Sequence, residues 1–315
     1  MATLMDVAKL ANVSKMTVSR VINHPEQVTD ELKQLVYQAM NELDYRPNII
    51  AKALVSNSTR IIKLCILEDI DVVEPYYMNL MVGIAKALDA HQYSLQLVTR
   101  RNIDIGNCDG YIITGLRQPD VEWIQKLTKP FVVFGENRYG FDYVDTNNKK
   151  GIQLIAQLAL AKGYQHLVYI GMNSQESFEK SREAGYLQQM QDSKLIPEMY
   201  HFKNHSRLTE VFVDEHWAQF NRNTVFVCAT DRLAIGVERA IAKRGGNIPQ
   251  EYGITGFDGV FLNQVASPKI TTIKQAVIEM GSACGEKVLD KISQKDSQGS
   301  LIFEPQIEIG GTLRV

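Results

Sequence analysis

From residue 61 onward, short apolar runs alternate with longer segments of helical periodicity, and this alternation is the strongest constraint on the fold. The short runs are apolar almost throughout, as in strands that are buried on both faces of a parallel sheet. The strand-like runs are 61–67, 93–98, 110–114, 131–134, 166–171, 224–229 and 253–257, and the helical segments are 78–91, 152–161, 178–190 and 233–243. These segments suffice for two doubly wound parallel sheets, so the sequence predicts an α/β body at 59–315.

The first 46 residues follow a different pattern, which predicts three short helices. Thr3 can cap a first helix whose apolar positions recur at three- and four-residue spacing. Asn12 tolerates the left-handed conformation of a tight turn, and Ser14 can cap a second helix. Thr29, followed by two acidic residues, predicts the start of a third helix, and Pro47 ends this unit. The buried stripe that we expect on the third helix is Leu32, Leu35, Val36, Met40 and Leu43.

The second predicted helix presents a polar and basic face. Its apolar positions are Val18, Val21 and Ile22, which leaves Lys15, Met16, Ser19 and Arg20 pointing away from the core of the head. Residues 1–60 carry seven Lys or Arg against six Asp or Glu, so DNA affinity would have to come from shaped contacts and not from a polybasic arm. The short turn and this outward face favour a helix-turn-helix head. An ordinary three-helix bundle is the alternative.

Two stretches, DVAKLANVSKMTVSRVINHPEQVT and ELDYRPNIIAKALVS, resemble the head and hinge of the LacI/GalR repressors. The resemblance implies a sequence-specific transcription regulator, with a DNA-binding head at 1–46 and a hinge helix and linker at 47–58. It implies that Lys15, Met16 and Arg20 contact base edges, and an arginine suits a bidentate contact with guanine. The residues implied to hold backbone phosphates are Ser14, Thr17, Ser19, Asn23 and Gln27.

Residues 47–54 resemble the family hinge, a short helix that forms on operator DNA and enters the minor groove as a pair. The resemblance implies DNA contacts from Asn48, Ala51 and Leu54, with Leu54 as an apolar wedge between base steps. A buried linker anchor is the alternative role for Leu54. Because the hinge pairs with its twin, we expect a homodimer on a near-palindromic double-stranded operator. The absence of a heptad tail favours a dimer over a tetramer.

The body also resembles this family, which shares with periplasmic sugar-binding proteins a fold of two lobes crossed by three strands, with a small effector in the cleft. The landmarks stand in the family's order, and they include CDGYIIT at 108–114, SREAGY at 181–186, ATDRLAIG at 229–236 and TGFDG at 255–259. The implied lobes are about 59–146 with 275–302, and 147–274 with 303–315. Ligands of such folds lie beyond the carboxyl ends of the strands.

The resemblance also implies the residues of an effector site. Arg182 and Asp258 match positions that grip the hydroxyls or charges of an effector. Further implied cleft residues are Tyr76, Asn147, Thr230 and Gln275. Tyr76 could equally be a core aromatic, and for Asp231 we favour helix capping over ligand contact. Asn147 stands where the family commonly has Asp. The implied function is a repressor of carbohydrate-utilisation genes, gated by a sugar or a sugar phosphate.

One departure from the family is large. Between Val98 and Cys108 the chain reads TRRNIDIGN, where the family usually fits a loop and a full helix. That missing element normally belongs to the first lobe. We therefore expect the first lobe to differ in stability, dimer packing or cleft depth.

The sequence gives less support to two other classes of function. A body that binds a protein co-regulator or a purine-like corepressor is the second possibility; a deep polar cleft would oppose the co-regulator. An enzyme is the third, but the GSACG at 281–285 lies within a helical pattern, which favours helix packing over a nucleophile elbow. The sequence predicts no metal site and no cofactor. The scattered Cys65, Cys108, Cys228 and Cys284 are expected to be free thiols. No apolar run is long enough for a membrane span or secretory signal, so we expect a soluble cytoplasmic protein.

Overall fold

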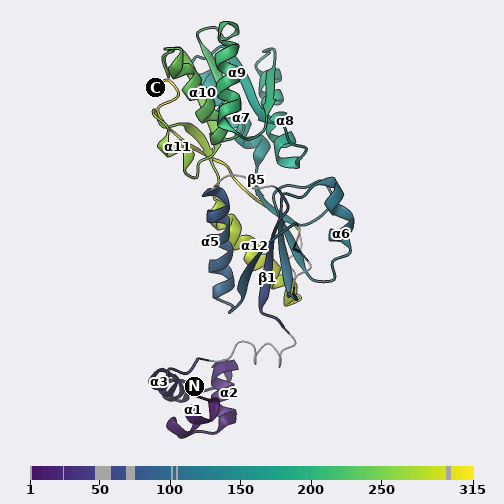
Figure 1. Cartoon of the computed structure of the whole chain (residues 1–315), viewed down its shortest axis with the longest axis vertical. Coiled ribbons are helices and arrows are strands. Elements are labelled where there is room, and N and C mark those ends of the chain that lie inside the picture. The colour runs from purple at the N-terminus through teal and green to yellow at the C-terminus, as the bar shows by residue number, and fades with distance from the viewer. Residues whose placement is uncertain are drawn as a thin grey trace. The chain divides into compact units, whose positions relative to one another are not determined.

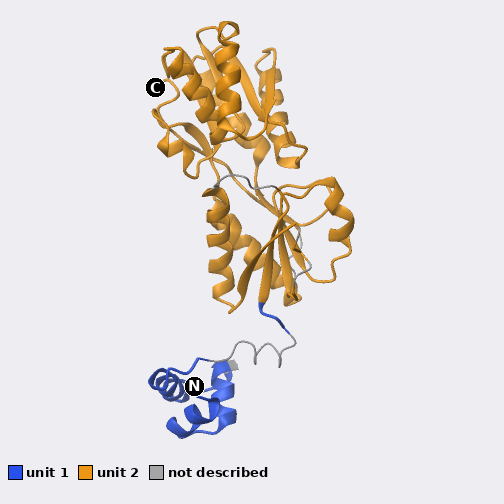
Figure 2. Cartoon of the chain, in the orientation of Figure 1, with its two compact units in different colours: residues 1–60 blue, residues 61–315 orange. Residues whose placement is uncertain are grey.

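The computed structural model describes residues 2–23, 25–46, 58–68, 75–100, 102–103, 106–295 and 299–315. The chain divides into two compact units, 1–60 and 61–315 (Figure 2). The first unit contains the predicted head, and the second contains the predicted body.

The head consists of helices α1 (Leu4–Leu10), α2 (Lys15–Asn23) and α3 (Asp30–Glu42), with a 3-10 turn η1 at Pro25–Gln27. Thr3 caps α1 in a capping box with Asp6. The hydroxyl of Ser14 accepts a hydrogen bond from the Thr17 amide at 3.0 Å, so it caps α2 as predicted. Asn12 has φ +50, the left-handed conformation predicted for the turn. The core of the head is Val7, Ala8, Ala11, Val18, Val21, Val36 and Ala39.

Helix α3 begins after Thr29 as predicted, with Asp30 and Glu31 in its first turn, although the Thr29 side chain makes no capping hydrogen bond. One expectation for α3 is wrong. Leu35 is 50% exposed, whereas Ala39 is buried. The stripe that faces the core therefore runs through Val36, Ala39 and Met40, and Leu35 falls outside it because its position on the helix points toward solvent.

The first lobe of the body is built on a six-stranded sheet in the order β11 (Leu301–Phe303), β5 (Tyr143–Thr146), β4 (Phe131–Phe134), β3 (Gly110–Thr114), β1 (Ile61–Ile66) and β2 (Ser94–Thr99). All neighbouring strands are parallel. Helices α5 (Pro75–Asp89) and α12 (Val277–Ile292) lie side by side on one face, as Figure 1 shows. The opposite face is covered by the short α6 (Val121–Gln125) and the 3-10 turn η2 (Gln118–Asp120).

The second lobe is built on another six-stranded sheet, in the order β12 (Gln306–Glu308), β10 (Thr271–Lys274), β9 (Tyr252–Asp258), β8 (Thr224–Cys228), β6 (His166–Met172) and β7 (Glu198–Phe202). Only the pairing of β12 with β10 is antiparallel among these described strands. Its helices are α7 (Asn148–Ala161), α8 (Ser177–Asp192), α9 (Ser206–Glu215), α10 (Asp231–Lys243), α11 (Leu262–Val265) and the 3-10 turn η3 (Trp217–Gln219).

The described chain passes between the two sheets at three places, between β5 and α7, between β10 and α12, and between β11 and β12. Helix α7 packs on α8, and α9 packs on α10. This arrangement confirms the predicted fold class, a helical head followed by two parallel-sheet lobes. None of the helices formed by the described residues is long and apolar enough to cross a bilayer.

Helices α5 and α12 approach each other closely at glycines. A Cβ atom added to Gly83 would lie 2.0 Å from the carbonyl oxygen of Ile278, and one added to Gly281 would lie 2.5 Å from that of Leu80. Gly281 belongs to the GSACG stretch, which lies wholly within α12. This confirms that the stretch serves helix packing and not a strand-to-helix elbow.

The shortened connection from β2 to β3 has no helix in its described residues, 102–103 and 106–109. Lys63 of β1 is only 1% exposed and extends toward this connection. Its Nζ donates to the carbonyl oxygens of Ile103 at 2.9 Å and Gly106 at 2.8 Å. The same ammonium lies 5.8 Å from the centroid of the Tyr111 ring. A buried lysine therefore anchors the connection that lacks a helix.

Candidate functional sites in the head and the cleft

Helix α2 presents the polar face that the sequence predicts. Met16 is 71% exposed, and Lys15 and Arg20 are also exposed, because buried Val18 and Val21 fix the orientation of the helix. The remaining predicted contacts lie as follows: Ser14 and Gln27 are exposed, Thr17 and Ser19 are partly buried, and Asn23 ends the helix. Asn48, Ala51 and Leu54 lie outside the described residues. The DNA contacts themselves stay predictions.

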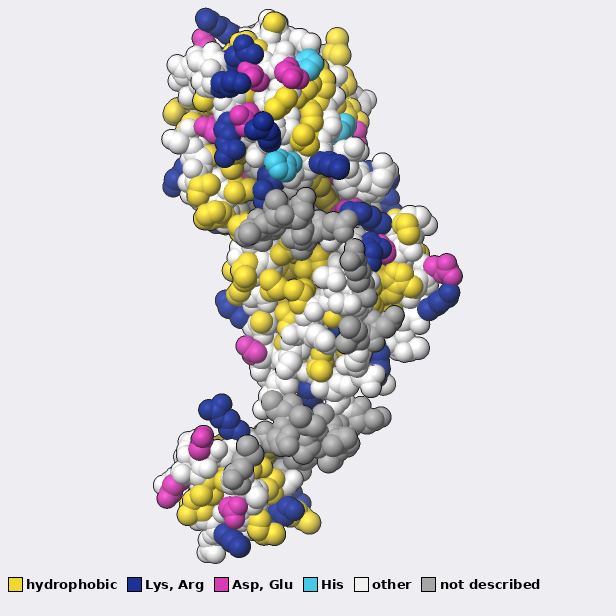
Figure 3. Space-filling view, viewed as in Figure 1, with side chains coloured by type: hydrophobic (Ala, Val, Ile, Leu, Met, Phe, Trp, Pro, Cys, Tyr) yellow, Lys and Arg dark blue, Asp and Glu magenta, His cyan; other side chains and the backbone are white. Residues whose placement is uncertain are grey.

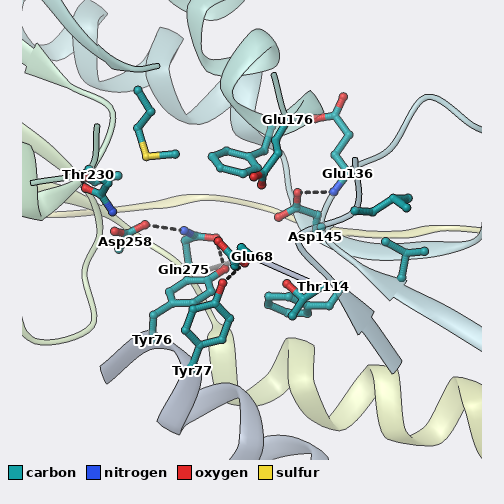
Figure 4. A pocket seen from close by; sticks show the side chains of 18 of the residues that line it. Glu68, Tyr76, Tyr77, Thr114, Glu136, Asp145, Glu176, Thr230, Asp258 and Gln275 are labelled. Atoms are coloured by element: carbon teal, nitrogen blue, oxygen red, sulfur yellow. Dashed lines mark hydrogen bonds between the residues drawn. The ribbon is translucent and has the colours of Figure 1, made fainter. Parts of the chain in front are cut away.

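A cavity of about 210 Å³ lies between the two lobes of the body. Its walls come from the carboxyl ends of strands in both sheets and from the first turns of α5 and α8, where ligands of open α/β sheets bind. Figure 4 shows the polar side chains converging on this space. The lining residues are Glu68, Tyr76, Tyr77, Thr114, Gly115, Leu116, Val133, Phe134, Gly135, Glu136, Asp145, Met172, Glu176, Phe178, Arg182, Asn204, Thr230, Asp258 and Gln275.

Gln275 joins both lobes on one wall of the cavity. Its Nε2 donates to Asp258 Oδ1 at 2.9 Å, and its Oε1 accepts from the hydroxyl of Tyr76 at 3.3 Å (Figure 4). Burial raises the pKa of Tyr76 well above its usual value, so the phenol remains a hydrogen-bond donor. Asp258 has φ +122, a conformation that a residue other than glycine seldom adopts. Such backbone strain is often found at functional sites.

Arg182 reaches the cavity from α8 and is only 4% exposed. Its Nε donates to Asn148 Oδ1 at 2.9 Å, and its Nη1 donates to the carbonyl oxygen of Ala229 at 2.7 Å. The guanidinium carbon lies 3.7 Å from the ring centroid of Phe257 and 4.9 Å from that of Phe178. Hydrogen bonds and ring faces therefore hold this side chain in one position.

The opposite wall is acidic, which the sequence did not reveal. The buried carboxylate of Asp145 accepts hydrogen bonds from the Glu136 amide at 2.7 Å, the Thr146 amide at 2.6 Å and Asn148 Nδ2 at 2.9 Å. Burial raises the pKa of Asp145, and the hydrogen bonds from the Glu136 and Thr146 amides offset part of this rise. The resulting pKa is about 6. Glu136 Oε1 accepts from the hydroxyl of Ser181 at 2.7 Å, and this bond joins the two lobes.

Two further acids line the cavity. Glu176 pairs with Arg117 at 3.5 Å, again between the lobes. Burial raises the pKa of Glu176. Glu68 accepts from the hydroxyl of Tyr77 (Figure 4). Glu68, Glu136 and Glu176 follow strands β1, β4 and β6, so their places after strand ends are the signal that could have revealed them.

The structure brings five of the six predicted effector residues to the cavity. Tyr76, Arg182, Thr230, Asp258 and Gln275 line it, whereas Asn147 does not. The Asn147 side chain instead caps α7 by accepting from the Lys150 amide at 3.1 Å. Whether the five residues contact an effector stays a prediction.

The expected role of Asp231 as a helix cap is wrong. Thr230 caps α10 by accepting from the Leu233 amide at 3.2 Å. The buried Asp231 carboxylate instead accepts from the Gly259 amide at 2.8 Å and from the Thr272 hydroxyl at 2.6 Å. Asp231 thus ties α10 to the end of β9 and to β10, and it fixes the turn that carries Asp258.

The four cysteines are buried free thiols, as the sequence predicts. In Figure 3 the Lys and Arg side chains of the second lobe are interspersed with Asp and Glu side chains. That visible face of the lobe thus has no continuous basic stripe of the kind that nucleic acid attracts.

Comparisons with known proteins match both units. A family model described as bacterial regulatory proteins of the lacI family matches residues 3–48, and one described as a periplasmic binding protein-like domain matches residues 156–313. The uncharacterized HTH-type transcriptional regulator YvdE of Bacillus subtilis (strain 168) is 50% identical over 309 residues, which cover 98% of each chain.

Two more distant proteins are also similar over nearly their whole length. The ribose operon repressor of Haemophilus influenzae (strain ATCC 51907 / DSM 11121 / KW20 / Rd) is 26% identical and is matched over 97% of this chain and 96% of its own. A solved structure of the lac repressor dimer bound to operator and the anti-inducer ONPF has a TM-score of 0.82 at 20% identity, with 100% of this chain and 99% of that chain covered. At this identity the likeness concerns the fold.

Proposed function

Because this chain belongs to the LacI family of bacterial DNA-binding transcriptional regulators, we propose that it is a homodimeric repressor of carbohydrate-utilisation genes, gated by a small sugar in the cavity between its lobes. It acts in the cytoplasm on a near-palindromic operator. The single observation that carries the effector part is the cavity itself, which joins fixed donors, fixed acceptors and aromatic rings at the carboxyl ends of both sheets. An open polar cavity of this kind argues against the hypothesis that the body binds only a protein co-regulator.

The head supports sequence-specific binding through the exposed face of α2. Lys15, Met16 and Arg20 point outward from a helix whose other face is buried, as a recognition helix requires. The N-terminal end of α2, with Ser14, is suited to a backbone phosphate. With almost balanced charge in residues 1–60, one head would bind weakly, so two copies on two half-sites are expected to supply the affinity.

The polar groups of the cavity suit a sugar, because each sugar hydroxyl can bond to both a hydrogen-bond donor and a hydrogen-bond acceptor. Asp258 and Asp145 offer carboxylate oxygens, while Tyr76 and Arg182 carry donors. Phe178 supplies an apolar ring beside them. The volume of about 210 Å³ falls below the roughly 300–1,000 Å³ of drug-sized ligand pockets, so a small effector fits best. Binding would shift the balance between lobe arrangements and, through the hinge, the fit of the paired heads.

A binding-site selection with the full chain tests the DNA part of this proposal. We expect a near-palindromic site bound by two chains. Arg20→Ala should weaken binding and relax the preference at one base pair per half-site, a loss of about 1–3 kcal/mol per contact. Lys33→Ala is the matched control, because Lys33 lies on α3 and pairs with Asp30 at 2.8 Å. An unchanged sequence preference in the Arg20 variant would remove α2 from the role of recognition helix.

A further inference from the structure

The described residues that line the cavity carry a strong excess of negative charge. The acidic side chains are Glu68, Glu136, Asp145, Glu176 and Asp258, and the only Lys or Arg among these residues is Arg182. The acids come from both lobes, so an enclosed ligand has carboxylates on more than one side (Figure 4). The raised pKa of Asp145, about 6, still leaves this carboxyl mostly ionised at neutral pH.

The one basic residue of this lining is partly engaged by the protein itself. Arg182 donates from Nε to Asn148 and from Nη1 to the Ala229 carbonyl, which uses two of its five N–H groups, and its guanidinium carbon lies over the ring of Phe257. Its charge also stabilises the ionised forms of Asp145 and Glu176. Its positive charge is therefore shared with acids that already line the cavity.

A further cation, outside the lining residues, is paired with one of the acids. Arg117 lies in the first lobe and pairs with Glu176 of the second at 3.5 Å. In this enclosed space each uncompensated carboxylate about 7 Å from an anionic group weakens binding by roughly three- to fifty-fold, for effective dielectric constants of about 80 to 20. Five carboxyl groups face the single charge of Arg182, and Arg117 offsets one of them, Glu176, so the remaining carboxylates still repel an anionic ligand.

We propose that the cavity discriminates by charge and that the effector is an unphosphorylated, uncharged sugar, with sugar phosphates, sugar acids and nucleotides excluded. This inference rests on the proposed function, because it specifies the ligand class of the same cavity. The carboxylates that exclude anions would accept hydrogen bonds from the sugar hydroxyls, while Arg182 and Gln275 orient the ring. Exclusion of the phosphorylated form would let the regulator respond to the free sugar alone.

The test is a thermal-shift screen of the full chain with matched compounds, followed by calorimetry. The library pairs sugars with their phosphates, such as glucose with glucose 6-phosphate, ribose with ribose 5-phosphate and trehalose with trehalose 6-phosphate, and pairs purine bases with their nucleotides. We expect an uncharged sugar to raise the melting temperature and its phosphate to bind at least tenfold more weakly. A sugar phosphate that binds as tightly as its parent sugar would overturn the charge inference while leaving the sugar function standing. A purine base as the only ligand, or a screen without any ligand, would overturn the sugar function and with it this inference.

A charge-neutralising variant shows whether the acidic wall causes the discrimination. Glu176→Gln removes one carboxylate and leaves Arg117 without its partner, so the ratio of the two dissociation constants should fall by about tenfold. Glu122→Gln is the matched control, because Glu122 also pairs with a cation, Lys126 at 2.7 Å, but lies exposed on α6 outside the cavity. Equal ratios in the original chain and in the Glu176 variant would contradict the proposal.

Discussion

Replacement of the buried Lys63 by methionine should destabilise the first lobe by several kcal/mol. Methionine keeps most of the aliphatic length of the side chain but has no donor for the carbonyl oxygens of Ile103 and Gly106. Each hydrogen bond from a charged group contributes roughly 1.5–3 kcal/mol net, so the two together contribute about 3–6 kcal/mol. Relief of the buried charge and entry of water at the two carbonyls offset part of this loss, so we expect a net cost of about 2–4 kcal/mol.

Urea unfolding of the full chain, followed by circular dichroism, measures this cost as a shift of the transition midpoint at constant slope. Lys86→Met is the matched control, because Lys86 is an exposed lysine on α5 of the same lobe. The control should change the free energy of unfolding by less than about 0.5 kcal/mol. If Lys63→Met shifts the midpoint no more than Lys86→Met does, the lysine does not anchor the connection between β2 and β3.

Two further variants test other parts of the body. The pKa of the Asp145 carboxyl is raised from 3.8 to about 6 in the folded chain, so the folded state holds this proton more tightly than the unfolded state does. The contribution of the protonated carboxyl to the free energy of unfolding is therefore complete below pH 4 and is lost as the pH rises through about 6. The stability of the original chain relative to Asp145→Asn should therefore fall by about 3 kcal/mol between pH 4 and pH 7, and a pH-independent difference would refute this. Gly281→Val should cost more than about 3 kcal/mol in the same urea assay, because its side chain would enter the backbone of α5. Glu286→Val, at an exposed position of the same helix α12, should cost much less. Equal costs would contradict the close contact of α5 and α12.

Much of the fold could be predicted because it depends on patterns that are local in the sequence. The apolar strand runs predicted two parallel sheets, and the caps at Thr3 and Ser14 marked the starts of the first two helices of the head. The prediction for Leu35 failed because hydrophobicity alone does not decide which residues of a helix face the core. Lys63 could not be predicted to be buried, since its partners are carbonyl groups about 40 residues away, which no side-chain pattern reports.

The candidate site was predicted only where family motifs carried it. Arg182, Asp258 and Gln275 lie in recognisable stretches, and the structure brings them to one cavity. Glu68 and Glu136 lie in loops after strands and have no motif of their own, so their places after strand ends were the one local signal that they could converge. Asn147 failed as a cavity residue because its position directly before α7 gives its side chain a nearer partner in the free Lys150 amide.

The glycine contact between α5 and α12 has a consequence for the order of events during synthesis. These two helices cover the same face of the first sheet, yet roughly 200 residues of chain lie between them, which take about 10–40 s to translate at 5–20 residues per second. The DNA-binding head is finished before this interval begins. For that time a nascent chain holds a single folded head joined to a first lobe whose sheet face is covered by α5 without α12. The cavity between the lobes is therefore completed last, once α12, β11 and β12 have left the ribosome and α12 has packed against Gly83.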